Sequence, residues 1–184
     1  MQMRQDDYDN AIKFLALRAM GVQCEQRKLI DWAFTVLEHG LESKHLLWLA
    51  GLSENSDILD MLDFFEAALI ELGAKPLEGD ELLSEFVRMT CRQFLEKKIS
   101  ADRAMNRLNR ICDHTEWDFD REFNLPFFNL LQESDHIYHV RQSDPALADK
   151  LSIEFNTSMT DEFKRYLDAP VSSIAQHSGL STQH

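Results

Sequence analysis

Apolar residues recur at intervals of three and four positions along the chain from residue 6 to about residue 112. This spacing is typical of amphipathic helices, because it gathers side chains on one face at about 100° per residue. It predicts helices over residues 6–20, 25–39, 43–50, 57–72 and 80–97, and a sixth helix capped by Ser100. Gly21, Gly40 and Gly73 follow three of these stretches, where a helix commonly ends. No stretch alternates apolar and polar residues long enough to indicate a strand.

The predicted helix over 57–72 combines the densest apolar and acidic sequence in the chain, and Ser53 or Ser56 is expected to cap it. Its expected core face consists of Ile58, Met61, Leu62, Phe64, Phe65, Ala68, Leu69 and Leu72. The opposite side carries Asp60, Asp63, Glu66 and Glu71, with Leu59, Ala67 and Ile70 among them. This pattern is typical either of a contact surface for a basic partner or of a solvated helix back.

The remaining chain predicts fewer regular elements. We expect the helix over 43–50 to be buried on most sides, Pro126 to open a short helix, and Asp144 with Pro145 to start another. Thr160 is expected to cap a last turn or two ending at Leu167. The sequence thus predicts an all-α, compact bundle of about six to nine helices without a sheet, in one domain over 1–169. Residues 170–184, rich in Ser, Gln and His, are expected to form a frayed tail.

Negative charge is concentrated in one segment of the 184-residue chain. The formal net charge is −13, and residues 51–85 carry ten acidic residues against a single base, Lys75. Such a surface repels nucleic acid phosphates and anionic lipid, and it accelerates encounter with basic proteins. The sequence therefore favours a cationic protein partner over direct nucleic acid or membrane binding, although acidity also serves solubility alone.

Targeting signals and disulfide patterns are absent from the sequence. No apolar run reaches the length of a signal peptide core or a membrane span, so we expect a cytoplasmic protein. Cys24, Cys91 and Cys112 are an odd number of widely spaced cysteines, which fits reduced, buried thiols better than disulfides or a zinc site.

A basic row on the sixth predicted helix is the strongest candidate for catalysis. Its members, spaced by four, three and four residues on one helix face, are Arg103, Arg107, Arg110 and His114. Arginine can hold a phosphate while histidine transfers protons, as in RNA cleavage. Arg107 followed by His114 resembles the motif of the helical HEPN ribonucleases, but Leu108 stands where that motif has its polar residue. The alternative is that these arginines pair with acids of neighbouring helices.

Other chemistry finds no support in the sequence. A group of acids and imidazoles matches no metal signature by its spacing, and we predict neither a metal nor a cofactor. Its members are Asp113, His114, Glu116, Asp118, Asp120, Asp135, His136 and His139. Nucleophile elbows, phosphate-binding glycine loops and dinucleotide fingerprints are also absent.

Trp117 and Phe119 lie among acids in the least regular part of the chain, together with other aromatic residues. Rings that supply buried area, next to acids that select a basic partner, are typical of interface anchors. The alternative is that these rings cover an open end of the helical core.

Residues 44–113 carry a pattern with a resemblance to a family. The pattern consists of Trp48–Leu52, a helix ending in Ile70–Gly73, and a helix leading to Ile99–Ala101. It resembles a family of small uncharacterised bacterial helical proteins, some of which accompany toxin loci as immunity proteins. The resemblance implies a helical fold and a protein partner, and it transfers no catalytic residue.

The sequence therefore predicts an acidic inhibitor of immunity or antagonist type, which occludes a basic effector that acts on nucleic acid. The predicted partner-binding residues are Asp60, Asp63, Glu66, Glu71, Trp117 and Phe119. The alternatives are a HEPN-like ribonuclease using Arg107 and His114, and a non-catalytic subunit of a larger assembly.

Overall fold

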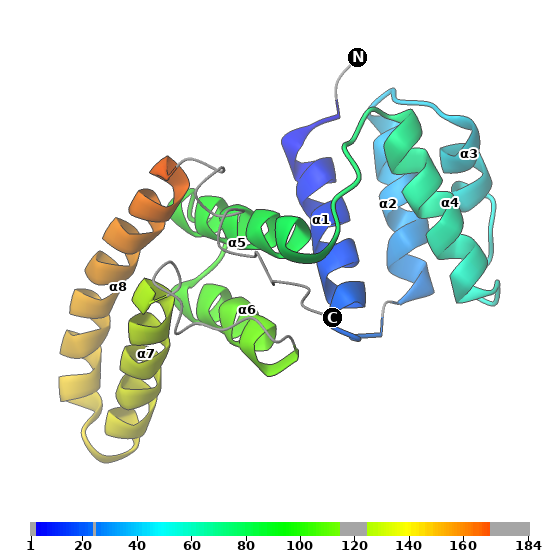
Figure 1. Cartoon of the computed structure of the whole chain (residues 1–184). Coiled ribbons are helices and arrows are strands. Elements are labelled where there is room, and N and C mark those ends of the chain that lie inside the picture. Colours follow the sequence, from blue (N-terminus) through cyan, green and yellow to red (C-terminus); the bar gives the residue numbers. More distant parts are fainter. Residues whose placement is uncertain (1–2, 24, 115–124, 170–184) are drawn as a thin grey trace, which may run out of the picture. The chain divides into compact units, whose positions relative to one another are not determined.

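The computed structural model describes residues 3–23, 25–114 and 125–169, with side chains described for 3–23, 25–111 and 127–169. Within these ranges the regular structure consists of eight helices without a strand, which confirms the all-α prediction (Figure 1). Contacts divide the chain into two compact units, residues 1–82 and 83–184. The single domain over 1–169 stays a prediction, and the tail predicted over 170–184 lies outside the described residues. None of the described helices combines the length and apolarity needed to cross a membrane.

Unit 1 contains four helices, which begin and end within one residue of their predicted positions. They are α1 (Gln5–Ala19), α2 (Gln26–Glu38), α3 (Lys44–Ala50) and α4 (Ile58–Glu71). Gly21, Gly40 and Gly73 have φ angles of +68°, +80° and +84°. Glycine adopts this left-handed conformation without steric cost, so three of the four helices are followed by glycine turns as predicted.

The core of unit 1 is centred on Phe65 of α4, which is fully buried. Its ring packs edge-to-face against the rings of Trp32 and Phe14, with centroid distances of 4.7 Å and 6.0 Å, respectively. The Trp32 indole Nε1 donates a hydrogen bond of 2.9 Å to the backbone oxygen of Asp7. Rings from α1, α2 and α4 thus form one aromatic cluster, and the buried Trp32 N–H of this cluster has a hydrogen-bond acceptor.

Two predictions about unit 1 are wrong in detail. Asp57, rather than Ser53 or Ser56, caps α4, because its Oδ1 accepts the Leu59 N–H at 2.8 Å. The short helix α3 buries Leu46 and Leu49 but exposes Leu47 and Trp48. A seven-residue helix packed against α2 and α4 has too little length to cover every apolar side chain it carries.

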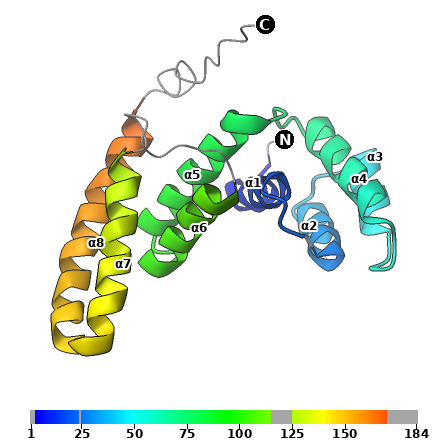
Figure 2. The same ribbon diagram turned by 60° about the horizontal axis from the view of Figure 1, so that its bottom comes forward.

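Unit 2 contains most of α5 (Gly79–Leu95), which crosses the boundary, and α6 (Ala101–His114), α7 (Leu125–Ser143) and α8 (Pro145–Asp168). Figures 1 and 2 both show α7 and α8 side by side as a long hairpin. Phe163 of α8 is fully buried and contacts the rings of Phe94 and Phe127 at centroid distances of 5.3 and 5.8 Å. Asp144 caps α8 as predicted, since its Oδ1 accepts the Leu147 N–H at 3.0 Å.

The sequence prediction underestimated both helices of this hairpin. The helix opened near Pro126 is not short, because α7 continues to Ser143. Thr160 caps nothing: α8 runs through it without a break, and its hydroxyl donates to the Asn156 carbonyl at 2.7 Å inside the helix. Threonine serves both as a helix cap and as a back-bonded residue within a helix, so its position alone did not distinguish them.

Candidate protein-binding surface

The outward side of α4 combines exposed aliphatic and acidic side chains. Leu59 is 63% exposed and Ile70 is 58% exposed, although both are large and apolar. Asp60 and Asp63 are also exposed, and neither forms a hydrogen bond or ion pair with the described residues. We call these four residues the α4 face. Their spacing of one, three and seven positions along the helix places them on one side of it, as the sequence predicted.

Glu66 is less available than the two aspartates. It is half-buried, and its carboxylate forms an ion pair with the Arg18 guanidinium of α1. This pair joins the first and fourth helices of unit 1 at the surface. The predicted partner-binding role of Glu66 therefore competes with a contact inside the unit.

Glu71 connects the end of α4 to the beginning of α3. Its Oε2 accepts the His45 backbone N–H at 3.1 Å, and its Oε1 lies 2.7 Å from His45 Nδ1. The backbone N–H and, next, the Ser43 side chain lower the pKa of Glu71 from 4.5 to about 2. Because His45 lies in the first turn of α3, this carboxylate also satisfies a helix N-terminal donor.

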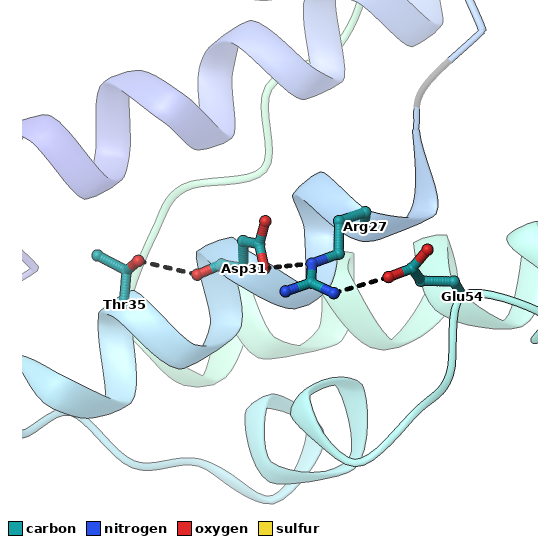
Figure 3. Close-up of polar contacts among 4 residues, drawn as sticks. All are labelled: Arg27, Asp31, Thr35 and Glu54. Carbon is teal, nitrogen blue, oxygen red and sulfur yellow. Dashed lines mark hydrogen bonds and ion pairs between the residues drawn. The ribbon is translucent and has the colours of Figure 1, made fainter.

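Much of the remaining charge between residues 51 and 85 is also engaged within the molecule. Glu54 binds Arg27 at 2.7 Å, and Arg27 also binds Asp31 at 2.8 Å, so the guanidinium lies between two carboxylates (Figure 3). Hydrogen bonds to Glu54 and then Asp31 raise the pKa of Arg27 above its ordinary value. Further pairs join Glu81 to Lys75 and Glu85 to Arg92. Asp60 and Asp63 of the α4 face are therefore among the few carboxylates of this segment that form no ion pair or hydrogen bond with the described residues.

An aromatic group lies beside the α4 face. Trp48 of α3 is 46% exposed, and its ring centroid lies 5.5 Å from that of Phe64 on α4. Lys44 Nζ lies 4.3 Å from the Trp48 ring centroid, and the His45 ring lies 5.2 Å away. Phe64 follows Asp60 by one helical turn, so the rings lie next to the Asp60 side of the α4 face. Trp48 is not among the predicted partner-binding residues, because α3 was expected to be buried on most sides.

The other predicted anchors and the ribonuclease residues have different outcomes. Trp117 and Phe119 lie outside the described residues, and so does the side chain of His114. Arg107 Nη1 donates a hydrogen bond of 2.8 Å to Gln93 Oε1 of α5. Gln93 is a neutral amide and not the acid that the structural alternative expects, so this alternative and the ribonuclease hypothesis both stay predictions.

The described cysteines and potential metal ligands form no reactive site. Cys91 is fully buried, and burial raises the pKa of its thiol, as expected for an inert cysteine. Cys24 and the Cys112 side chain lie outside the described residues. Among the side chains that the structure describes, no three potential metal ligands are grouped. The Asp135 and His139 side chains lie one turn apart on α7, at 3.6 Å.

Comparison with known proteins adds no family assignment: no family model, curated protein or solved structure matches the chain. Function must therefore be argued from the surface itself. Of the features above, the α4 face with its neighbouring tryptophan unites exposed apolar area with unpaired charge.

Proposed function

We propose that the chain binds a basic protein partner through the α4 face, with Trp48 as an additional anchor, and that it thereby inhibits the partner. The observation that carries this proposal is the exposure of Leu59 and Ile70 beside two carboxylates, Asp60 and Asp63, that have no partner among the described residues. Charge directs the encounter of two proteins, whereas buried apolar contacts slow their dissociation. The α4 face supplies both.

The partner's chemistry follows from this arrangement. Lysine or arginine side chains opposite Asp60 and Asp63 would form ion pairs, and aliphatic side chains between them would cover Leu59 and Ile70. Lys44 stacks its ammonium on the Trp48 ring, so a partner's arginine would have to displace Lys44 before it could stack on that face of the indole. A partner with basic and apolar residues so combined fits an effector that acts on nucleic acid, since two carboxylates would compete with phosphates for its basic side chains.

Of the four acids of α4 that the sequence predicts to bind a partner, only Asp60 and Asp63 remain available for this role. Glu66 and Glu71 are engaged by Arg18 and His45, and releasing them would cost contacts inside unit 1. We therefore assign Asp60 and Asp63 to the partner and assign Glu66 and Glu71 to holding the helices that present them. The resemblance to immunity-type helical proteins supports the same kind of function.

The charge contribution is tested by reversal. The tagged chain captures its partner from a lysate of its native host, the partner is purified, and its affinity is measured at low and physiological salt. Asp60→Lys/Asp63→Lys is expected to weaken binding about tenfold or more and to reduce its salt dependence. Glu154→Lys/Asp161→Lys on α8 changes the same charge at exposed positions and should bind like the wild type. Equal loss in both variants would contradict the assignment to α4.

The apolar contribution is tested by dissociation rate. Leu59→Ser/Ile70→Ser and Trp48→Ala are each expected to accelerate dissociation from the purified partner, because the buried contact area is lost. The matched control is Ile153→Ser on α8, which removes a side chain that is 70% exposed. Unchanged dissociation in both α4-side variants would reject this surface.

Inhibition is a separate outcome from binding. The purified partner is assayed for nucleic acid binding or cleavage with and without the chain, and the Asp60→Lys/Asp63→Lys variant serves as the control. Loss of partner activity only with the wild type supports an inhibitor. A tight complex that keeps its activity would instead identify a non-catalytic subunit.

A further inference from the structure

Unit 2 contains a groove that takes no part in the proposed protein contact. It has a volume of about 760 Å³ and lies between α6, α7 and α8. Its floor includes Met105, Ile137 and Phe155, all of which are buried. Small-molecule sites commonly have this size, with an apolar floor and a few polar groups at the edge.

The charges along the groove favour a cation. Asp102 of α6 and Asp135 of α7 both line it and are exposed. Asp102 forms no ion pair with the described residues, and Asp135 has only the exposed His139 imidazole at 3.6 Å. Arg141 is the single basic residue of the lining, and Ser152 Oγ accepts from its guanidinium at 3.0 Å.

Arg141 is also drawn toward α8 by the Asp149 carboxylate, at 3.9 Å. An anionic ligand would thus meet two carboxylates and one arginine that already has acceptors. A cationic ligand would meet two carboxylates with little competition. The electrostatic balance therefore selects positive charge in this groove.

The uncharged lining distinguishes an organic cation from a metal ion. Tyr138 is 63% exposed at the edge, so its aromatic face is available to an ammonium group, while the buried Phe155 contributes apolar surface to the floor. Asn106 and Asn156 add side-chain carbonyls, which accept hydrogen bonds from N–H donors. The described side chains offer no group of three metal ligands, whereas the apolar floor suits methylene groups.

We infer that this groove binds a small organic cation of the linear polyamine class, in which ammonium groups are joined by methylene chains. Asp102 and Asp135 bind the ammonium groups, and the floor formed by Met105, Ile137 and Phe155 covers the methylene groups. The site belongs to unit 2, so its test is independent of the α4 face in unit 1.

The test is a titration of the full chain with spermidine at physiological salt. Calorimetry measures the binding, and backbone amide chemical shifts locate it. We expect saturable binding, with the shift changes concentrated in α6, α7 and α8. Glutarate, a dicarboxylate with a similar methylene chain, should give no saturable shifts. Shifts spread over all acidic parts of the chain without saturation would show only counterion condensation and would overturn the proposal.

Matched variants separate a site from general acidity. Asp102→Asn/Asp135→Asn is expected to weaken spermidine binding about tenfold, because two partly exposed ion pairs are lost. Glu154→Gln/Asp161→Asn removes the same charge from α8 positions outside the groove lining and should leave the affinity unchanged. Equal effects of the two double variants would reject the site. Tyr138→Ala changes an exposed side chain and keeps every charge, and it should also weaken spermidine binding. If neither Tyr138→Ala nor Asp102→Asn/Asp135→Asn weakened binding, the site would likewise be rejected.

Discussion

The two units use their acidic residues differently. In unit 1 the acids Glu54, Glu66 and Glu71 join neighbouring segments through Arg27, Arg18 and His45, whereas Asp60 and Asp63 form no pair with the described residues. In unit 2 the acids of the groove, Asp102 and Asp135, come from different helices and have little to pair with. High acidic content is therefore no measure of available charge. Acids with few internal contacts are the ones available to a partner or ligand.

The cores of the units differ in a related way. In unit 1, Phe65 of α4 contacts the ring of Phe14 on α1 and the ring of Trp32 on α2. In unit 2, Phe163 of α8 contacts the rings of Phe94 on α5 and Phe127 on α7, and further buried residues, Phe155 and Met159, continue along the same face of α8. Because Phe65 and the rings that contact it all belong to unit 1, loss of this side chain should destabilise unit 1 more than the hairpin of α7 and α8.

The largest expected effect comes from Phe65→Ala. Emptying this fully buried site should destabilise the protein by about 3–5 kcal/mol, because both the transfer free energy and the packing around the cavity are lost. Hydrogen exchange should locate the loss of protection mainly in α1 to α4. The measurement is urea unfolding combined with exchange read by mass spectrometry.

Phe34→Ala is the matched control for this prediction. Phe34 lies in the same unit but is 51% exposed, so its loss should change the unfolding free energy little. If Phe65→Ala reduced protection in α7 and α8 as much as in unit 1, the separation of the two cores would be wrong.

A second, smaller effect is expected at the middle of α8. Ser158 is exposed, and its backbone N–H lies inside a continuous helix. Ser158→Pro should therefore cost about 3 kcal/mol through a lost helical hydrogen bond and a steric clash. Ser158→Ala should be neutral or slightly stabilising. Tolerance of the proline in thermal unfolding would restore the break between Phe155 and Thr160 that the sequence predicted.

That comparison explains how far the sequence predicted the structure. In α4, a broad apolar face and an acidic back repeat at one period, so its bounds, buried face and exposed leucine and isoleucine were all predicted. In α7, the buried Phe127, Leu130 and Ile137 are followed by many polar residues, and one side opens onto the groove. A helix contacted on several sides lacks a single apolar stripe, so periodicity underestimated it.

The candidate sites were predicted less completely than the helices for a different reason. Sequence identifies an acid but not its partner, and the contacts of Glu66 and Glu71 depend on Arg18 and His45, which lie far away in the chain. Exposure of Trp48 likewise depends on how much of α3 its neighbours cover. The groove requires three helices to be in place, and two of them were predicted too short.

The smallest predicted effect concerns Glu71 and depends on pH. Its pKa falls from 4.5 to about 2 on folding, mainly because it accepts the His45 backbone N–H. A group whose pKa is lowered by folding stabilises the folded state above its unfolded pKa, and this contribution disappears as the pH falls through the folded pKa. Glu71→Gln should therefore destabilise the chain at pH 6, and the difference from the wild type should shrink between about pH 4.5 and 2.

This last prediction distinguishes an acid used inside unit 1 from an acid available to a partner. The side-chain carboxyl chemical shift of Glu71 should show its titration near pH 2, while Glu78→Gln, at an exposed connector residue, should change stability at pH 6 less than Glu71→Gln does. A Glu71 that titrates near 4.5 would be free of His45. The carboxylate would then be as accessible as Asp60 and Asp63, and the α4 face would have to be enlarged to include it.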